Sequence, residues 1–172
     1  EALGLGIELG PRDIAVRGNF ATVEHRDGQP IVTDRRAGRI STEENRRIVK
    51  KITENISDIE GVEVNVYSGL EHRFVVVFTM EGEVPEGSDE IDDTDHQKTG
   101  KPTLKAEGKN TESKKTADII QKFVERVGEI TKDEEKANYP LLRGISACPN
   151  LESYSEIYGL KSACIATYPM YR

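Results

Sequence analysis

Tryptophan is absent from the chain, and aromatic residues make up only 6% of its 172 residues. An excess of basic charge is also lacking, because 31 acidic residues outnumber 24 basic ones and the formal net charge is -7. Binding to a nucleic-acid backbone needs a basic surface, so this composition disfavours a nucleic-acid partner. The length suits one domain, or one domain and a fragment of another, and it permits a substantial core.

Long apolar runs are missing as well. No segment approaches the roughly 18 to 20 apolar residues of a membrane span. Residues 1–10 lack the basic stretch and apolar run of a signal peptide. We therefore expect a cytoplasmic protein that uses no membrane. The cysteines, Cys148 and Cys164, lie outside any CxxC pattern, which favours buried, reduced thiols over a disulfide or a metal site.

Several sequence motifs of catalysis have no match in the chain. It contains no nucleophile elbow, Walker A loop, GxGxxG sequence or HExxH sequence. The histidines, His25, His72 and His96, are too scattered along the chain to indicate a site. The residues taken alone therefore predict no group that makes and breaks bonds.

Hydrophobic periodicity predicts two strand–strand–helix units. In chain order these are a strand over 14–26, a return strand from residue 31, a helix over 42–57, strands over 62–67 and 74–80, and a helix over 116–132. Two such units favour an α+β fold, with a four-stranded, mainly antiparallel sheet and both helices on one face. A long polar loop separates the last strand from the second helix.

The end of the chain follows a different pattern. Residues 142–146 read as a short strand, residues 151–158 as a short helix that ends at Gly159, and residues 163–167 as another strand. This is a partial α/β segment, so we divide the chain into a domain over 1–140 and a segment over 141–172. The chain has no initiating methionine and stops directly after a predicted strand, so we expect a larger protein.

The most informative segment precedes the first predicted helix and carries one aspartate and three arginines: Asp34, Arg35, Arg36 and Arg39. Guanidinium groups form paired hydrogen bonds with carboxylates and phosphates, and a helix N-terminus also attracts anions. The segment therefore predicts a site for a small organic anion. Alternatively, it is a solvated loop whose arginines pair with Glu43 and Glu44.

Three other groups of polar residues have two interpretations each. Arg17 and Asn19 share the face of the first strand opposite its apolar residues, either as part of a site or as ordinary exposed positions. His72 and Arg73 either mark the end of a strand or join the arginine segment. Residues 92–96 form either a metal site or a flexible acidic loop.

Six blocks of sequence, in this order and spacing, have counterparts in one enzyme family: residues 1–10, 13–23, 34–39, 71–73, 93–96 followed by Gly100, and 143–144. Together they resemble the archaeal-type cofactor-independent (2,3-bisphosphoglycerate-independent) phosphoglycerate mutases over nearly the whole chain. One departure is Asp95-His96, where the family pattern has Asp-Pro-His.

The resemblance implies an enzyme of the alkaline phosphatase superfamily. Such an enzyme interconverts 3-phosphoglycerate and 2-phosphoglycerate through a phosphoserine intermediate, without 2,3-bisphosphoglycerate. Its core domain binds two divalent metal ions, typically manganese, and a substrate-binding domain is inserted into that core. This chain would be the inserted domain and the start of the returning core segment. The nucleophilic serine and the metal ligands would then lie outside residues 1–172, in the remainder of the same polypeptide.

The resemblance also gives the arginines a task, which is to hold the glycerate while the phosphoryl group sits on the serine. The substrate-binding residues predicted in this way are Arg17, Asn19, Arg35, Arg36, Arg39, Arg73 and His96. Asp34 or His72 would transfer hydroxyl protons. One rival is a related phosphotransferase that acts on homoserine or pentose phosphates, and another is a stand-alone, non-catalytic module that binds anions.

Overall fold

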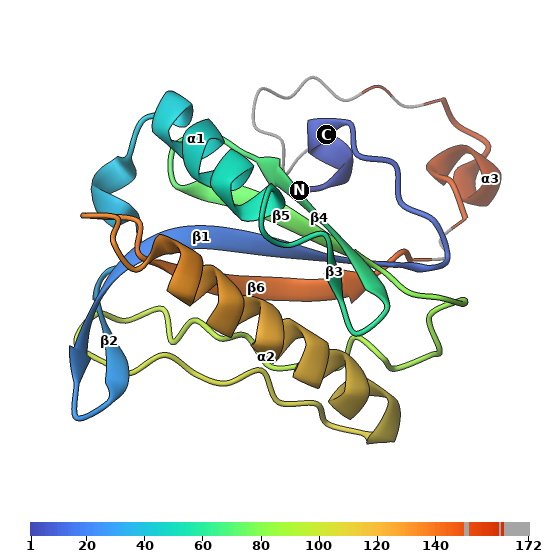
Figure 1. Cartoon of the computed structure of the whole chain (residues 1–172). Helices are drawn as coiled ribbons and strands as arrows, with labels where there is room; N and C mark the ends of the chain where they lie inside the picture. The colour runs from blue at the N-terminus through green and yellow to red at the C-terminus, as the bar shows by residue number, and fades with distance from the viewer. Residues whose placement is uncertain (150–151, 162, 164–172) are drawn as a thin grey trace.

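The computed structural model describes residues 1–149, 152–161 and 163. Its centre is an antiparallel sheet of six strands. The strands are β1 (Asp13–Arg26), β2 (Gln29–Asp34), β3 (Asp58–Ile59), β4 (Val62–Ser68), β5 (Arg73–Thr79) and β6 (Tyr139–Ala147). The long helices α1 (Thr42–Thr53) and α2 (Thr111–Thr131) lie together on one face (Figure 1). The predicted α+β class is therefore confirmed.

Strand β1 organises the sheet. The strand order is β2-β1-β5-β4-β3, and β6 also pairs with β1. Residues 14–19 of β1 lie between β5 and β6, whereas residues 22–26 pair with β2 in a hairpin. The sheet therefore has six strands rather than the four that the sequence predicts, because β3 and β6 add to the expected set.

Strand β6 joins the same sheet as the earlier strands. Leu141 and Leu142 lie on opposite faces of β6, and both are fully buried. They become buried because β6 pairs with β1. The predicted division between residues 140 and 141 thus falls inside β6, because hydrophobic periodicity cannot tell which partner a strand will pair with. The strand predicted over 163–167 falls outside the described residues except for its first position.

The two long helices begin at capped positions. Ser41 Oγ accepts a hydrogen bond from Glu44 N at 3.1 Å, so α1 starts where its capping sequence predicts. Helix α2 begins at Thr111 rather than at 116, because Asn110 and Ser113 cap each other's backbone N–H groups. Its first turn is polar, and apolar periodicity alone does not detect it. The short helix α3 (Tyr154–Tyr158) ends at Gly159, as predicted.

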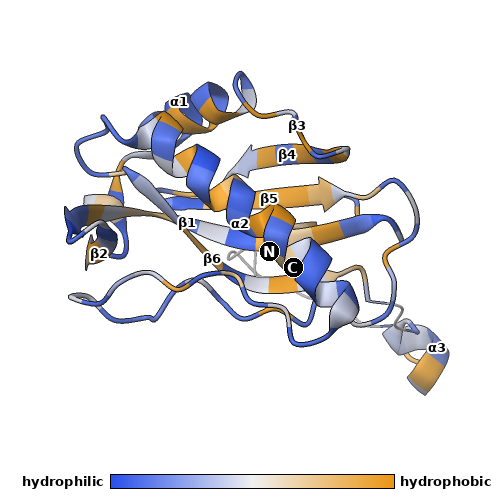
Figure 2. Cartoon of the chain, turned by 60° about the horizontal axis from the view of Figure 1, so that its bottom comes forward, coloured by the Kyte–Doolittle hydropathy of each residue, from blue (hydrophilic) through white to orange (hydrophobic). Residues whose placement is uncertain are grey.

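The core lies between the sheet and the two helices. Phe20 and Phe74 stack with ring centroids 4.6 Å apart, and Phe78 meets Phe123 of α2 edge to face at 5.5 Å. Gly18 lies under the Phe74 ring, where any Cβ would overlap the ring. Strand β5 is hydrophobic along most of its length, as Figure 2 shows, because both faces of this strand are covered.

The opposite face of the sheet is covered in part by the N-terminal segment, which includes the 3-10 helix η1 (Leu3–Leu5). Ala2 packs there with Val75 and Val77 of β5, and Leu5 and Leu9 border this cluster. None of the helices in the described ranges is long and apolar enough to cross a membrane. The face without α1 and α2 is thus only half covered, and polar side chains occupy the rest.

The acidic segment after β5 is held against β6 rather than loose. Leu142 N donates to Thr94 Oγ1 at 2.8 Å, and Thr94 N donates to Leu142 O at 2.9 Å. Asp93 accepts from Gly144 N at 2.8 Å. Cys148 is a free thiol, as predicted, but it is only partly buried, with its Sγ 3.6 Å from a backbone oxygen. Cys164 lies outside the described residues.

Candidate anion-binding site

The strand register gathers arginines on the sheet face opposite the helices. Arg17 of β1 pairs with Arg143 of β6, and Asn19 of β1 pairs with Arg73 of β5. Directly paired residues of antiparallel strands project to the same face, about 5 Å apart at Cβ. We call Arg17, Asn19, Arg73 and Arg143 the open-face cluster. Like charges on paired positions repel, so this arrangement favours a compensating anion.

Arg35 lies next to this cluster and holds a carboxylate. Its Nε donates to Asp95 Oδ1 at 3.0 Å, and its Nη2 donates to Asp95 Oδ2 at 2.5 Å. The Asp95 side chain is only 1% exposed. Burial alone would raise the pKa of Asp95, but the hydrogen bonds from Arg35 and from Gln97 N, with the nearby charge of Arg143, hold that pKa below its ordinary value. Asp95 therefore lies between two arginines as an anion.

Two more carboxylates reach the arginines of the open-face cluster. Glu1 Oε2 lies 3.1 Å from Arg17 Nε, and Asp93 Oδ2 lies 3.7 Å from Arg143 Nε. A cavity of about 160 Å³ opens beside Arg17, between the N-terminal segment, β5 and the end of β6. A small ligand in this cavity would meet the Arg17 guanidinium at its wall.

Asp34 organises the backbone of the arginine segment. Its two carboxylate oxygens accept hydrogen bonds from Arg36 N and Gly38 N, both at 2.8 Å. The 3-10 helix η2 (Ala37–Arg39) follows, and all three of its residues have positive φ angles, of 48°, 61° and 52°. The backbone of a residue other than glycine is strained at such angles. Asp34 thus holds an unusual turn from which Arg36 and Arg39 extend exposed side chains.

His72 is buried beside the same turn, with 2% exposure. Burial lowers the pKa of His72 to about 4, helped by the charges of Arg73, Arg36 and Arg39 and opposed by Glu71. The imidazole is therefore neutral at pH 7 and can accept a hydrogen bond or a proton. Its Nδ1 has no hydrogen-bond partner within the described part of the chain, although Glu71 Oε2 lies at 3.7 Å.

Asn19 offers a second buried acceptor, since it is 6% exposed and its Oδ1 also has no hydrogen-bond partner among the described residues. Buried polar atoms are normally hydrogen-bonded, so an orphan atom at a charged surface points to a ligand. His96 differs from the other predicted residues: it follows Asp95 but is exposed to solvent.

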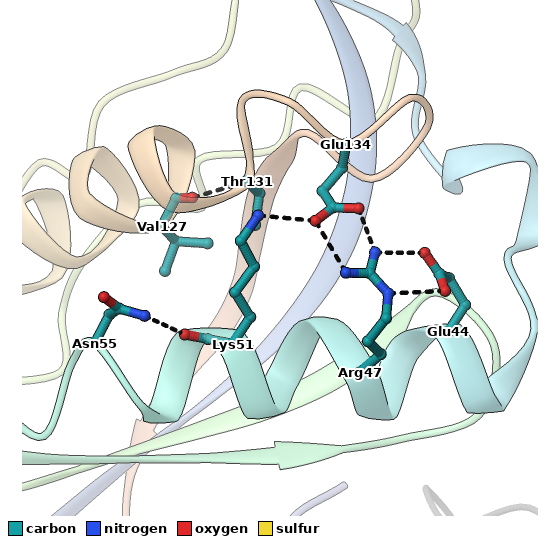
Figure 3. A network of polar contacts seen from close by, with 7 residues as sticks. All are labelled: Glu44, Arg47, Lys51, Asn55, Val127, Thr131 and Glu134. Atoms are coloured by element: carbon teal, nitrogen blue, oxygen red, sulfur yellow. Dashed lines mark hydrogen bonds and ion pairs between the residues drawn. The ribbon is translucent and has the colours of Figure 1, made fainter.

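The alternative pairing of the arginine segment with the first turn of α1 is not what the described contacts show. Glu44 instead binds Arg47, which also contacts Glu134, and Lys51 Nζ donates to Glu134 Oε1 at 2.9 Å (Figure 3). We call these four residues the helix–loop network. It joins α1 to the loop between α2 and β6.

Two residues of the site were missed by sequence reasoning. Arg143 was noted only within the family blocks, although its alternation with the buried Leu142 signals the open face. Asn45 lies on the apolar face of α1, in register with Ile48 and Ile52, and is completely buried. A polar residue in the apolar stripe of a helix is the signal that could have found it.

Within the described ranges, no group of three or more histidine, cysteine, aspartate or glutamate side chains could hold a metal ion. The residues of the candidate site, mainly arginines, do not suit a cation. A larger cavity of about 640 Å³ lies between the β1–β2 hairpin, residues 102–105 and α2, and none of the predicted site residues lines it. The arginines make this group of residues a candidate site for an anion.

The fold and the site define an α+β domain with a candidate anion site built from arginines, and comparison with known proteins gives the family. Residues 1–137 match the family model of 2,3-bisphosphoglycerate-independent phosphoglycerate mutase. The chain therefore belongs to this family, as its sequence blocks predict. A relative from Aquifex aeolicus, named "Probable 2,3-bisphosphoglycerate-independent phosphoglycerate mutase", is 52% identical across 100% of this chain.

Other relatives agree with this assignment. A Thermotoga maritima protein of the same name is 47% identical over 172 residues. The solved cofactor-independent phosphoglycerate mutase of Thermoplasma acidophilum superposes with a TM-score of 0.72 and 31% identity, covering 98% of this chain and 46% of that one. The chain spans only 42% and 41% of the lengths of the two curated relatives.

Proposed function

We propose that this chain is the substrate-binding part of a phosphoglycerate mutase that interconverts 3-phosphoglycerate and 2-phosphoglycerate through a phosphoserine intermediate. In this proposal the chain holds the glycerate and its phosphate, and residues outside 1–172 carry out the phosphoryl transfer. The observation that carries the proposal is the open-face cluster, in which paired strands set Arg17 against Arg143 beside the buried Asn19, whose Oδ1 has no hydrogen-bond partner in the described part of the chain.

The cluster suits a hydroxylated anion. Arginine forks bind the planar carboxylate or the phosphate, with charge-assisted hydrogen bonds that fix orientation as well as affinity. Asn19 Oδ1 accepts a hydrogen bond from a substrate hydroxyl. Such a grip keeps the glycerate in place while its other hydroxyl turns toward the phosphoserine, which lowers the entropic barrier to transfer.

Each predicted residue has a specific part in this proposal. Arg17, Arg73 and Arg143 contact the anion, and Arg35 supports them through Asp95 while its Nη1 stays available to the ligand. The exposed Arg36 and Arg39 contact the distal end of the substrate, and His96 adds a hydrogen bond at the rim. His72 transfers the hydroxyl proton. Asp34 acts as a positioning residue for the turn, because its carboxylate is occupied by backbone N–H groups.

Further parts of the proposal concern the rest of the enzyme. Two divalent metal ions, most suitably manganese, would be bound by the remainder of the polypeptide. That remainder would form an alkaline-phosphatase-like core, which is the partner of this chain. The residues after β6 would lead back into this core. The enzyme is expected to be cytoplasmic and to act in glycolysis and gluconeogenesis.

Binding and activity assays test the proposal. Isothermal titration of this chain should detect 3-phosphoglycerate and 2-phosphoglycerate, with much weaker binding of inorganic phosphate. In the longer polypeptide with added manganese, Arg35→Ala should reduce mutase turnover far more than phosphorylation of the serine. Equal loss of both activities would contradict a role in holding glycerate, and mutase activity of residues 1–172 alone would contradict the division of labour.

Two rivals give different outcomes in the same assays. A related phosphotransferase would prefer homoserine phosphate or a pentose phosphate over phosphoglycerate in the titration. A stand-alone, non-catalytic module would bind an anion but would have no coding sequence continuing beyond residues 1 and 172. Neither rival has a specific observation in its favour.

A further inference from the structure

The turn between β4 and β5, residues 69–72, is anchored by the start of α1. Asn45 Nδ2 donates to Glu71 O at 2.6 Å and to Arg73 O at 2.7 Å. Thr42 Oγ1 accepts a hydrogen bond from Glu71 N at 3.1 Å. Both polar backbone groups of Glu71 are thus bound by side chains of one helix.

This anchoring acts on a strained residue. Glu71 has a φ angle of 55°, in the left-handed region where a residue other than glycine is disfavoured. Such conformations cost about 1–3 kcal/mol and persist only when their surroundings hold them. The two hydrogen bonds between α1 and Glu71 supply that restraint. Arg73 O accepts a second hydrogen bond, from Gly69 N at 2.8 Å, whereas the donor described for Glu71 O is Asn45 Nδ2.

The anchored turn joins the two halves of the candidate site. It carries His72 and Arg73, and His72 O accepts a hydrogen bond from Phe20 N at 2.7 Å, directly beside Asn19. Helix α1 follows the arginine segment, separated from Arg39 by Ile40 and the N-cap Ser41. A shift of the turn relative to α1 would therefore move His72 and Arg73 away from Arg36 and Arg39.

We propose that Asn45 is a positioning residue, which holds the β4–β5 turn in its strained conformation and thereby sets the affinity of the site for phosphoglycerate. The inference rests on the proposed function for its ligand but not for its geometry. Asn45 itself touches no substrate. It is completely buried on the face of α1 that carries Ile48 and Ile52, where an apolar residue would not bind the turn.

The test replaces Asn45 with leucine, which has the same number and branching of side-chain heavy atoms, a somewhat larger volume and no donor. Asn45→Leu should bind 3-phosphoglycerate about tenfold more weakly, because losing a buried hydrogen bond costs about 1–3 kcal/mol. The amide of Glu71 should exchange with solvent at least tenfold faster, and the His72 imidazole resonances should shift in nuclear magnetic resonance spectra. Thr42→Val, a milder change that removes only the acceptor for Glu71 N, should weaken binding to a smaller extent.

A matched control separates positioning from general loss of stability. Asn110 is also an asparagine whose amide joins a helix to a loop, since its Nδ2 donates to Gly87 O at 2.9 Å and its Oδ1 accepts from Ser113 N at 2.8 Å. Asn110→Ala should lower stability by about 1 kcal/mol and leave the affinity within twofold of the unmodified chain.

The outcomes are distinct. If the unmodified chain binds phosphoglycerate and both Asn45→Leu and Thr42→Val bind it equally well, the inference is overturned and the proposed function stands. If Asn110→Ala weakens binding as much as Asn45→Leu, the effect is one of stability and the inference is also overturned. If the unmodified chain binds no phosphoglycerate, the proposed function fails, and the affinity claim for Asn45 fails with it.

Discussion

The open-face cluster and the helix–loop network are built from similar charged side chains but differ in how their charges are arranged. In the helix–loop network, Arg47 lies between Glu44 and Glu134, and Lys51 binds Glu134 as well (Figure 3). In the open-face cluster, Arg17 faces Arg143 across strands, each with one carboxylate nearby, Glu1 and Asp93 respectively. Asn19 keeps a buried acceptor atom without a hydrogen-bond partner among the described residues.

This difference indicates how a charged cluster that stabilises the fold can be distinguished from one that binds a ligand. A network whose opposite charges alternate satisfies itself and needs no ligand. A cluster that sets two arginines opposite each other and keeps a buried acceptor without a hydrogen-bond partner among the described residues has capacity left for a ligand. Changes in the first should therefore alter stability alone, and changes in the second should alter binding. Four predictions test this contrast.

Removal of Arg35 should have the largest effect. Arg35→Ala leaves the buried Asp95 carboxylate without its paired donor, so we expect a loss of about 3 kcal/mol of unfolding free energy, together with loss of 3-phosphoglycerate binding. Urea denaturation and titration calorimetry measure the two quantities. Arg36→Ala is the control, because that exposed side chain should change stability by less than about 0.5 kcal/mol. Equal stability of the two variants would contradict the assignment.

The pH dependence of stability should reveal His72. Its pKa is lowered from 6.5 to about 4 in the folded chain, so the unfolded chain binds more protons between these values. The stabilisation from the neutral imidazole is complete above pH 6.5 and is lost as the pH falls through 4. The total loss is at most about 3 kcal/mol of unfolding free energy. His72→Gln should flatten the unfolding free energy measured between pH 7 and 4.5. An unchanged slope would show that His72 is not buried as described.

The lowered pKa values of Asp95 and Glu134 act in the same direction as that of His72, but at lower pH. Because both carboxylates are present in His72→Gln, they contribute equally to the two proteins compared. The difference between the two pH profiles therefore isolates the imidazole.

Arg143 should affect binding without a large effect on stability. Arg143→Ala removes one charge-assisted contact, so the affinity for 3-phosphoglycerate should fall about tenfold. Arg126→Ala is a matched control: Arg126 is an exposed arginine that donates to a backbone oxygen, Asp58 O, at 3.1 Å and lies outside the site. Titration calorimetry measures the affinity of both variants for 3-phosphoglycerate. Equal affinities would count against the open-face cluster as the binding site.

The smallest effect is expected in the helix–loop network. Arg47 is half exposed, and exposed ion pairs contribute about 1 kcal/mol or less. Arg47→Ala should lower the unfolding free energy by about that amount, and by less at high salt, with unchanged phosphoglycerate affinity. A clear loss of affinity would remove the distinction between the two clusters.

Much of the fold could be predicted from local patterns. The alternation of Ile14, Val16 and Phe20 predicts β1, and the capping sequence at Ser41 predicts the start of α1. The first turn of α2 and the partner of β6 could not be found in this way, because one is polar and the other depends on which strand edge is open. Strand pairing is a non-local choice that hydrophobic periodicity does not specify.

The candidate site divides in the same way. The sequence indicates Arg17, Asn19 and the arginine segment as an anion site, and it places His72 and Arg73 at a strand start. It cannot indicate that Asp95 binds Arg35, across 60 residues of chain, nor that Arg143 pairs with Arg17. Whether these predicted residues bind substrate stays a prediction.

The sequence by itself determined the chemistry of this protein, because residue type fixes charge and hydrogen-bonding capacity, and local periodicity fixes most strands and helices. Tertiary structure alone decided which of those charges became neighbours. The register of β1 with β5 and β6 set arginines side by side on one face, while packing of α1 against the loop after α2 enclosed Arg47 between two carboxylates. Interaction energies depend on distance and burial, and only the folded chain sets those.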